Sequence, residues 1–252
     1  MKIALVQFSP AWENTEENIS KLDTLLESLT DETLVIFPEM TLTGFTMHST
    51  EFAEEIDGKG FLYFIQKSAE LKKHFFAGII EKDDGGIFNS LIHFDDKGLI
   101  TARYRKIHLF SMSKEDKFYS AGKETIVTKI NNVKIGLSIC YDLRFPELYR
   151  FYAKEKVDII VNIANWPVQR IEHWKHLLKA RAIENQCYMI GVNRTGADPF
   201  NKYNGASAVY DPLGNEIILA GEEEKIFTAG LDLESVNQTR NELPFLNDIK
   251  LL

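Results

Sequence analysis

Cysteine is scarce in this sequence, which contains only Cys140 and Cys187 among its 252 residues. Two cysteines are too few for a framework of disulfide bonds, so the chain suits a reducing compartment, and we expect the cytoplasm. Long apolar runs are also missing. No stretch approaches the roughly 20 residues that span a bilayer, and the apolar run at residues 1–8 is too short for a signal peptide. We therefore expect no membrane partner.

Basic residues are outnumbered as well. The chain has 29 lysines and arginines against 37 aspartates and glutamates, which gives a formal net charge of −8. A nucleic acid or an anionic membrane surface would require a concentrated basic face, whereas the basic residues here are scattered along the chain. Neither class of partner is therefore expected.

Linkers, repeats and low-complexity segments are absent, and 44% of the residues are hydrophobic. A chain of this length and composition can bury one large core, so residues 1–252 are expected to form a single domain. Helices and strands alternate near both ends of the sequence, and the middle, at residues 75–104, reads as an antiparallel meander. That order predicts an α/β fold in which two mixed sheets pack together with helices outside.

The apolar pattern also gives approximate limits for the other elements. Strands are expected at residues 3–8, 33–37, 125–130, 157–163 and 188–192, and helices at 14–29, 60–74 and 171–184. Asn14, with Glu17 three residues later, predicts a capping box at the start of the first helix. Two final strands are expected to flank the turn at residues 211–215, and a tail runs from residue 232 onwards.

The stretch at residues 134–149 reads K-I-G-L-S-I-C-Y-D-L-R-F-P-E-L-Y. Its first half is a short apolar strand and its second half opens an amphipathic helix, so Cys140 lies at the junction. A cysteine there is close to free backbone N–H groups and to the positive end of the helix dipole, and both favour a thiolate. Cys140 is therefore a candidate nucleophile. The alternative is a packed, inert cysteine, which is the common state of a lone free cysteine.

Two charged residues also fall where an apolar strand stops. Glu39 follows the strand expected at residues 33–37, and Lys106 follows the last strand of the meander. A carboxylate, an ammonium and a thiol together suit acyl transfer from an amide. Glu39 would move the protons, while Lys106 and the backbone N–H of Tyr141 would hold the oxyanion. The alternative for Lys106 is a surface lysine at the end of a hairpin.

Three motifs carry a resemblance to a known family. F-P-E-M at residues 37–40, Y-R-K-I-H-L-F at 104–110 and I-C-Y-D-L-R-F-P-E-L at 139–148 resemble the three motifs of the nitrilase, or carbon–nitrogen hydrolase, superfamily, in the expected order. The similarity covers nearly the whole chain. Each motif alone is a weak signal, but three in order with compatible spacing are a strong one.

The resemblance implies a four-layer αββα sandwich and a homodimer that pairs helices across a two-fold axis, with the tail from about residue 233 at the dimer interface. It also implies a catalytic triad of Glu39, Lys106 and Cys140, and a second supporting carboxylate that matches Glu115. The substrates implied are a small-molecule amide and water, with no cofactor.

Within this superfamily, N-W-P at residues 165–167, H-W at 173–174 and A-R-A-I-E-N-Q at 180–186 resemble the omega-amidase branch. Members of that branch hydrolyse the terminal amide of 2-oxoglutaramate and 2-oxosuccinamate. Such a substrate has a carboxylate at its far end, so a cation is expected several ångströms from Cys140. Arg144 is the first candidate, since the matching arginine in related carbamoylases contacts a carboxylate, and Arg170 is the second.

Other readings of these residues stay open. Arg144 could instead pair with Asp142 or Glu147. Trp166, Phe45 and Phe118 are candidate pocket walls, although each could equally be an ordinary core aromatic. His173 and His176 share a helical face but lack a third ligand, so no metal site is expected.

Alternative functions are also open at this point. They are a nitrilase, an N-carbamoyl amidohydrolase, a cysteine protease that pairs Cys140 with His108 or His173, and an inactive dimeric scaffold. The protease would leave Glu39 and Lys106 without a purpose, and the scaffold would have no reason to keep three ionisable residues at strand ends. The triad alone does not separate amides from nitriles.

Overall fold

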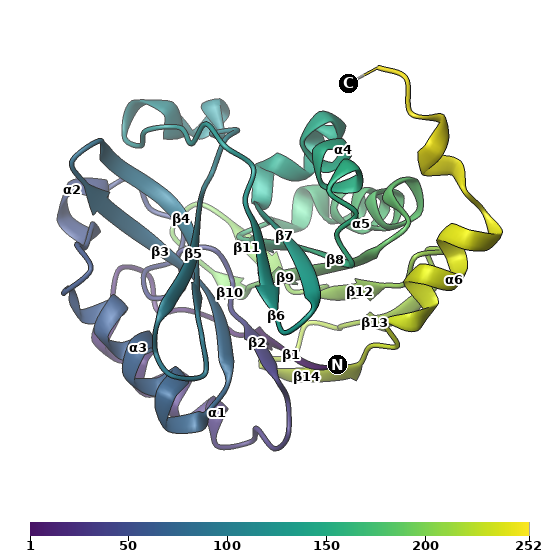
Figure 1. Ribbon diagram of the computed structural model, residues 1–252. Coiled ribbons are helices and arrows are strands. Elements are labelled where there is room, and N and C mark those ends of the chain that lie inside the picture. Colours follow the sequence, from purple (N-terminus) through teal and green to yellow (C-terminus); the bar gives the residue numbers. More distant parts are fainter. Residues whose placement is uncertain (252) are drawn as a thin grey trace.

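Two six-stranded sheets form the centre of the computed structural model, which describes residues 1–251 (Figure 1). The first sheet has the order β14-β1-β2-β3-β4-β5. Its strands are β1 (Lys2–Gln7), β2 (Leu34–Ile36), β3 (His74–Asp83), β4 (Gly86–Phe94), β5 (Ile100–Arg105) and β14 (Lys225–Gly230). β1, β2 and β3 run parallel, and the other neighbours are antiparallel, so the sheet is mixed.

The second sheet is also mixed and has the order β13-β12-β9-β8-β7-β6. Its strands are β6 (Val127–Ile130), β7 (Val133–Ile139), β8 (Ile159–Ala164), β9 (Tyr188–Asn193), β12 (Ala208–Tyr210) and β13 (Glu216–Leu219). The central strands β7, β8 and β9 are parallel and the outer pairs are antiparallel. A separate hairpin joins β10 (Thr195–Ala197) to β11 (Lys202–Asn204).

Helices cover the outer face of each sheet, which gives the expected αββα sandwich (Figure 1). The helices are α1 (Thr15–Leu26), α2 (Ser49–Phe52), α3 (Lys59–Leu71), α4 (Pro146–Lys154), α5 (Ile171–Asn185) and α6 (Glu234–Glu242). α1 and α3 pack on the first sheet, and α4 and α5 pack on the second. Half of the capping box predicted for α1 is present, since the Asn14 side chain accepts a hydrogen bond from the backbone N–H of Glu17. The Glu17 carboxylate accepts from the Asn14 side chain, while the backbone N–H of Asn14 donates to Ala11.

The alternation of side chains along each strand explains how one sheet packs against two apolar layers. Successive side chains of a strand point to opposite faces. In β3, Phe76 packs between the sheets in a cluster with Leu137 of β7, whereas its neighbour Phe75 packs outward in a cluster with Leu22 of α1 and Phe64 of α3. Both faces of the first sheet are therefore buried, and this burial stabilises the positions of the strand ends.

The end of the chain differs from the prediction. β14 is a strand that the apolar pattern did not predict, and residues 234–242 form α6 within what was expected to be a tail. None of residues 225–230 is buried and the segment is only weakly apolar, because β14 is the edge strand of its sheet. Its partner is β1, more than 200 residues earlier, and such a partner leaves no local signal.

The segment after Cys140 is also more broken than predicted. A short 3₁₀ turn covers residues 140–144, and the α-helix α4 begins only at Pro146. Proline disfavours helical geometry in the residue before it and fits the first position of a helix. Phe145 accordingly has the extended angles φ −108° and ψ 94°. Cys140 therefore lies on a tight turn and does not open α4.

A substitution in β3 tests how closely the two neighbouring segments pack. An added Cβ at Gly78 would lie 2.5 Å from the backbone nitrogen of Met40 and 2.7 Å from the carbonyl oxygen of Pro38. We expect Gly78→Ala to lower the free energy of unfolding by about 1–3 kcal/mol, as overpacking commonly does. Urea denaturation measures this.

Gly230→Ala is the matched control for this prediction. A Cβ at Gly230 would meet no atom within 4 Å, so its effect should stay within about 0.5 kcal/mol. Equal unfolding free energies for the two variants would contradict the close approach of β3 to residues 38–40.

Candidate active site

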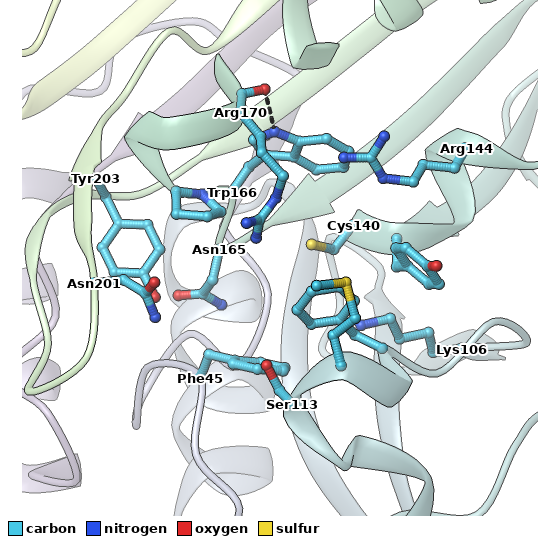
Figure 2. A pocket seen from close by; sticks show the side chains of 14 residues that line it. Phe45, Lys106, Ser113, Cys140, Arg144, Asn165, Trp166, Arg170, Asn201 and Tyr203 are labelled. Atoms are coloured by element: carbon cyan, nitrogen blue, oxygen red, sulfur yellow. Dashed lines mark hydrogen bonds between the residues drawn. The ribbon is translucent and has the colours of Figure 1, made fainter. Parts of the chain in front are cut away.

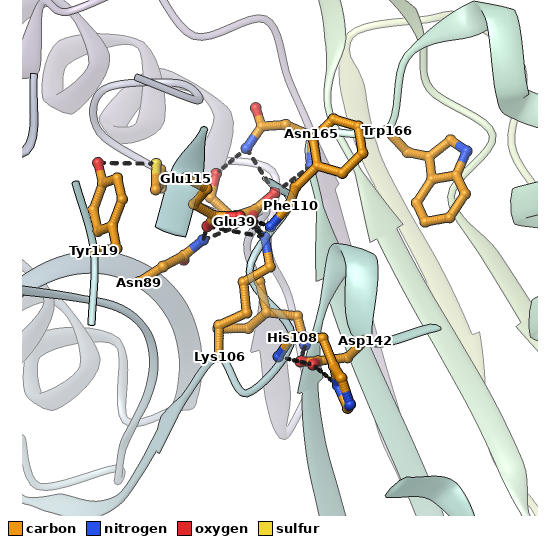
Figure 3. A network of polar contacts seen from close by, with 12 residues as sticks. Glu39, Asn89, Lys106, His108, Phe110, Glu115, Tyr119, Asp142, Asn165 and Trp166 are labelled. Atoms are coloured by element: carbon orange, nitrogen blue, oxygen red, sulfur yellow. Dashed lines mark hydrogen bonds and ion pairs between the residues drawn. The ribbon is translucent and has the colours of Figure 1, made fainter. Parts of the chain in front are cut away.

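Strand ends of both sheets meet at one buried cluster (Figure 3). Glu39 follows β2 and Lys106 follows β5, both in the first sheet, while Cys140 follows β7 and Asn165 follows β8 in the second. β2, β7 and β8 consist mainly of buried residues, whereas in β5 only Tyr104 is buried. The apolar strands thus position a set of polar side chains that would be costly to bury singly.

Lys106 lies at the centre of the cluster. Its Nζ is 2.8 Å from Glu39 Oε1 and 3.0 Å from Glu115 Oε2, and none of the three side chains is exposed to solvent. Asn89 of β4 joins the two carboxylates, because its Nδ2 donates to Glu39 Oε1 at 2.7 Å and to Glu115 Oε1 at 2.9 Å. The structure therefore brings Glu39, Lys106 and Glu115 into one hydrogen-bonded network.

The two carboxyl groups of this network differ in their pKa. Burial raises the pKa of Glu39, but the charge of Lys106 and the hydrogen bonds from Lys106, Asn89 and Asn165 outweigh burial and hold the pKa below its usual range. Burial, together with the charge of Glu39, raises the pKa of Glu115. Glu39 is therefore the member of the pair that stays ionised and can accept a proton.

Cys140 faces this network from the second sheet. Its backbone has φ 45°, in the left-handed region that residues with a side chain seldom adopt, and this turn ends β7 abruptly. Its side chain is only partly enclosed, and it lines a pocket. Burial and the charge of Glu39 raise the pKa of the thiol well above its usual range, against the effect of Lys106. This is opposite to the thiolate expected from the sequence.

Asn165 completes the surroundings of Glu39. The backbone N–H of Asn165 donates to Glu39 Oε2 at 2.9 Å, and Asn165 Nδ2 donates to the carbonyl oxygen of Glu39 at 2.7 Å. Both oxygens of the Glu39 carboxylate are therefore bound, Oε1 by Lys106 and Asn89 and Oε2 by Asn165. With its oxygens held in this way, the carboxylate keeps one orientation.

A second buried carboxylate network fastens the Cys140 turn to the Lys106 segment (Figure 3). Asp142 accepts hydrogen bonds from Tyr104 Oη at 2.7 Å, from the backbone N–H of His108 at 3.0 Å and from the backbone N–H of Ile139 at 3.0 Å. The His108 ring also contacts Asp142, with Nδ1 at 2.8 Å. Asp142 thus links the residues on both sides of Lys106 to the turn that carries Cys140.

A pocket of about 210 Å³ opens above Cys140 (Figure 2). Most of the residues predicted for a site are in its wall: Phe45, Lys106, Cys140, Tyr141, Arg144, Trp166 and Arg170. Phe118 was predicted as a wall residue but lies outside the pocket with 46% of its surface exposed. Its place is taken by Phe110, which comes earlier in the same loop region. Sequence spacing could not distinguish these two aromatics.

The pocket also contains residues that the sequence did not single out. The β10–β11 hairpin contributes Asn201 and Tyr203, about 60 residues beyond Cys140 in the chain. No local pattern pointed to these two residues. Asn89 was identifiable in principle, because a polar side chain inside the apolar strand F-N-S-L-I-H-F requires a buried partner.

Two arginines face the pocket without a carboxylate partner in the described chain, residues 1–251. The Arg144 guanidinium lies 4.8 Å from the centre of the Trp166 ring, and the Arg170 guanidinium lies 5.4 Å from the centre of the Phe110 ring. Burial and the nearby charge of Arg170 lower the pKa of Arg144. Arg144 does not pair with Asp142 or Glu147, so the structural alternative for this residue is wrong.

Two further features were sought in the described part of the chain, residues 1–251. No three His, Cys, Asp or Glu side chains in this range are grouped so that they could hold a metal ion. In the same range, no helix is long and apolar enough to cross a membrane.

The αββα sandwich brings a thiol and a lysine into one pocket and binds that lysine to a buried carboxylate, which is a set of groups suited to acyl transfer from an amide. Comparison with known proteins gives the family. The model of the carbon-nitrogen hydrolase family matches residues 2–241. The chain therefore belongs to the carbon–nitrogen hydrolase family and is an amidohydrolase.

Relatives of known sequence and structure agree with this assignment. The chain is 33% identical to 2-oxoglutaramate amidase of Bacillus subtilis, over 98% of this chain and 97% of that protein. It is 35% identical to omega-amidase YafV of Yersinia enterocolitica, over 98% and 96%. A CN-hydrolase superfamily protein of Xanthomonas campestris, solved with an arsenic adduct in its active site, has a TM-score of 0.96 and 33% identity, over 100% and 98%.

The protonation of Cys140 can be measured directly. Because burial and the Glu39 charge raise the pKa of the thiol, the ultraviolet thiolate absorbance that distinguishes wild type from Cys140→Ser should stay near zero up to about pH 9, past the ordinary thiol range. Burial also raises the pKa of Cys187 to about 12, so this second thiol should not contribute. Denatured protein is the control, since its thiols should titrate normally. A thiolate signal in the folded enzyme below about pH 8 would contradict the prediction.

Proposed function

We propose that this protein is an omega-amidase, which releases ammonia from the terminal amide of a small dicarboxylic or 2-oxo dicarboxylic acid, as in 2-oxoglutaramate. The observation that carries this proposal is the pair of arginines, Arg144 and Arg170, in the same pocket as Cys140 and without carboxylate partners in residues 1–251. Two guanidinium groups that lack carboxylate partners in residues 1–251, Arg144 contacting only the ring of His173 and the face of Trp166, suit a substrate with an anionic end and a reactive amide end. The names of the relatives support this substrate class.

The first half of the reaction begins at the neutral Cys140 thiol. Glu39 takes the thiol proton as Sγ attacks the amide carbon, and an S–C bond forms. Lys106 and the backbone N–H of Tyr141 stabilise the negative charge that develops on the carbonyl oxygen. Glu39 then transfers its proton to the amide nitrogen, the C–N bond breaks, and ammonia leaves a thioester on Cys140.

The second half reverses the proton transfers with water. Glu39 accepts a proton from a water molecule as the oxygen of that water attacks the thioester carbon. The S–C bond then breaks, the product leaves as a carboxylic acid, and Sγ recovers its proton from Glu39. Glu115 acts as a positioning residue in this scheme, because its two oxygens hold Lys106 Nζ at 3.1 and 3.0 Å.

Substrate length would be set by the distance between the arginines and Cys140. Anchoring the carboxylate end of a short chain limits where the amide carbon can lie, and a misplacement of about 1 Å can cost roughly 100-fold in rate. Arg144 is the preferred anchor, since it lies on the same short turn as Cys140, residues 140–144, and its charge is opposed by Arg170. A bound carboxylate would relieve the repulsion between the two cations. Trp166 and Phe45 would enclose the carbon chain.

We also propose that the protein works as a cytoplasmic homodimer. α4 and α5 expose Phe151 and Ile183, and the C-terminal segment exposes Phe245. In Figure 1, α4, α5 and the end of the chain lie on the same side of the molecule. A second copy related by a two-fold axis would cover these apolar side chains, including the segment from about residue 233. A free thiol as nucleophile suits a reducing compartment.

The covalent mechanism predicts that Cys140→Ala lowers ammonia release at least about 1000-fold without unfolding the protein, because no nearby group can replace the attacking sulfur. Mass spectrometry of wild type with a slowly hydrolysed substrate should detect an acyl group on Cys140. Cys187 is fully buried and serves as the internal control that should stay unmodified. Substantial turnover by Cys140→Ala would refute the mechanism.

The anchoring role predicts a change in substrate preference. Arg144→Met should lower kcat/KM about 10- to 150-fold for an acid amide, which corresponds to the roughly 1.5–3 kcal/mol of a charged hydrogen bond. The matching amide with an uncharged end should change little. Arg170→Met is the matched control and should have a smaller effect on the acid amide.

Two outcomes would separate the proposed substrate from the enzyme class. Equal wild-type rates for acid and neutral amides would refute the omega-amidase proposal while leaving an amidohydrolase. A faster rate on nitriles than on amides would favour a nitrilase instead.

A further inference from the structure

The Arg144 side chain has a polar partner whose role the proposed reaction does not explain. Its Nη1 and Nη2 atoms both lie 3.3 Å from Nδ1 of His173, an exposed residue in the first turn of α5. The guanidinium also lies over the Trp166 ring, 4.8 Å from its centre (Figure 2). His173 and Trp166 together therefore hold this guanidinium at the wall of the pocket that contains Cys140.

The His173 ring must be the acceptor in this contact. A guanidinium has N–H donors only, so both hydrogen bonds run from Arg144 to Nδ1 of His173, and that nitrogen carries no hydrogen. The imidazole is therefore neutral when it binds Arg144, with its hydrogen on Nε2. Two of the five N–H donors of the guanidinium are used in this way, and the other three can bind another partner.

The start of α5 is packed so that His173 stays beside Arg144. Trp174, the next residue, is fully buried, and its indole N–H donates to a backbone carbonyl oxygen at 2.8 Å. The ring centres of Trp174 and Trp166 lie 5.5 Å apart. The indole N–H of Trp166 in turn donates to the carbonyl oxygen of Arg170, just before α5, at 2.7 Å. These contacts fix the first turn of the helix against Trp166, the ring that also contacts Arg144.

A neutral acceptor orients a guanidinium without cancelling its charge. An aspartate or glutamate in place of His173 would form an ion pair with Arg144, and a substrate carboxylate would then have to displace it. The neutral imidazole has one lone pair for this contact and no negative charge, so the guanidinium keeps its full charge for a ligand. An anionic group that enters the pocket therefore meets a cation already in place.

We propose that His173 is a positioning residue for the anionic end of the substrate: as a neutral acceptor, it directs the Arg144 guanidinium into the pocket and so sets the preference for amides of an acid. This inference rests on the proposed function, in which Arg144 binds a carboxylate. His173 is not among the residues that line the pocket, so it acts through Arg144 and takes no part in the chemistry at Cys140.

Three substitutions at His173 separate the acceptor from the charge. The side-chain oxygen of His173→Asn can take the place of Nδ1, His173→Leu has no acceptor, and His173→Asp has an acceptor with a negative charge. For each variant, kcat/KM is measured on an acid amide and on the matching neutral amide. We expect the acid-to-neutral ratio to stay within about 2-fold of wild type in His173→Asn, to fall about 5-fold in His173→Leu, and to fall at least about 20-fold in His173→Asp.

His176→Asp is the matched control. His176 lies about one turn further along α5, its side chain is 80% exposed, and its ring contacts the backbone of Glu172 and no arginine. The same added charge at this position should change the ratio less than about 2-fold, because solvent screens a charge that touches no arginine. An equal fall in His176→Asp and His173→Asp would overturn the proposal, since it would indicate a long-range effect of charge.

A double-mutant cycle tests whether His173 acts through Arg144. His173→Leu should lower the ratio in wild type but change it less than about 2-fold in the Arg144→Met background, where no guanidinium is left to position. Equal effects in both backgrounds would overturn the proposal, as would a wild-type ratio in His173→Asp. Circular dichroism verifies the folding of every variant.

The same measurements distinguish this inference from the proposed function. Equal wild-type rates on acid and neutral amides would refute both the omega-amidase proposal and the role of His173. A preference for acid amides that survives Arg144→Met would refute the roles of Arg144 and His173 and leave the omega-amidase proposal standing. A preference that Arg144→Met removes and His173→Asp leaves intact would refute only the role of His173.

Discussion

The structure depends on one buried ammonium group held between two carboxylates. Lys106 has no contact with solvent, and Glu39 and Glu115 bind it within 3.1 Å. Removing Lys106 would leave two carboxylates buried without a cation, which is far more costly than the ion pairs are stabilising. The surrounding polar groups keep the cluster satisfied, and Asn89 bridges the two acids. The reactive groups are therefore rigid before any substrate arrives.

This cluster also separates the roles of two chemically identical side chains. Glu39 has a lowered pKa because the charge of Lys106 and the hydrogen bonds to both of its oxygens outweigh burial, whereas burial raises the pKa of Glu115. Because the pKa of the Cys140 thiol is raised, the thiol keeps its proton until the ionised Glu39 carboxylate accepts it. The resting site is then a neutral thiol beside a base, which differs from a preformed thiolate. Attack and proton transfer would occur together.

The pocket contains both the reactive groups and two cationic side chains. Its inner end presents Cys140, Lys106 and the Asn165 carboxamide, and its wall also carries the guanidinium groups of Arg144 and Arg170. Aromatic rings support both arginines, so their charges are held in place without carboxylate partners in residues 1–251. An occupant that fits this pocket of about 210 Å³ and pairs with the guanidinium groups must be small and anionic in one part.

The sequence alone determined the class of fold, the family and the identity of the strand-end residues, because apolar periodicity and three short motifs are local signals. Glu39, Lys106 and Cys140 were recognisable for this reason. Only the tertiary structure decided that Phe110 and not Phe118 lines the pocket, that β14 pairs with β1, and that burial raises the pKa of the Cys140 thiol. These features arise from contacts between segments distant in the chain, and from the burial and charges that those contacts create. No pattern of neighbouring residues encodes them.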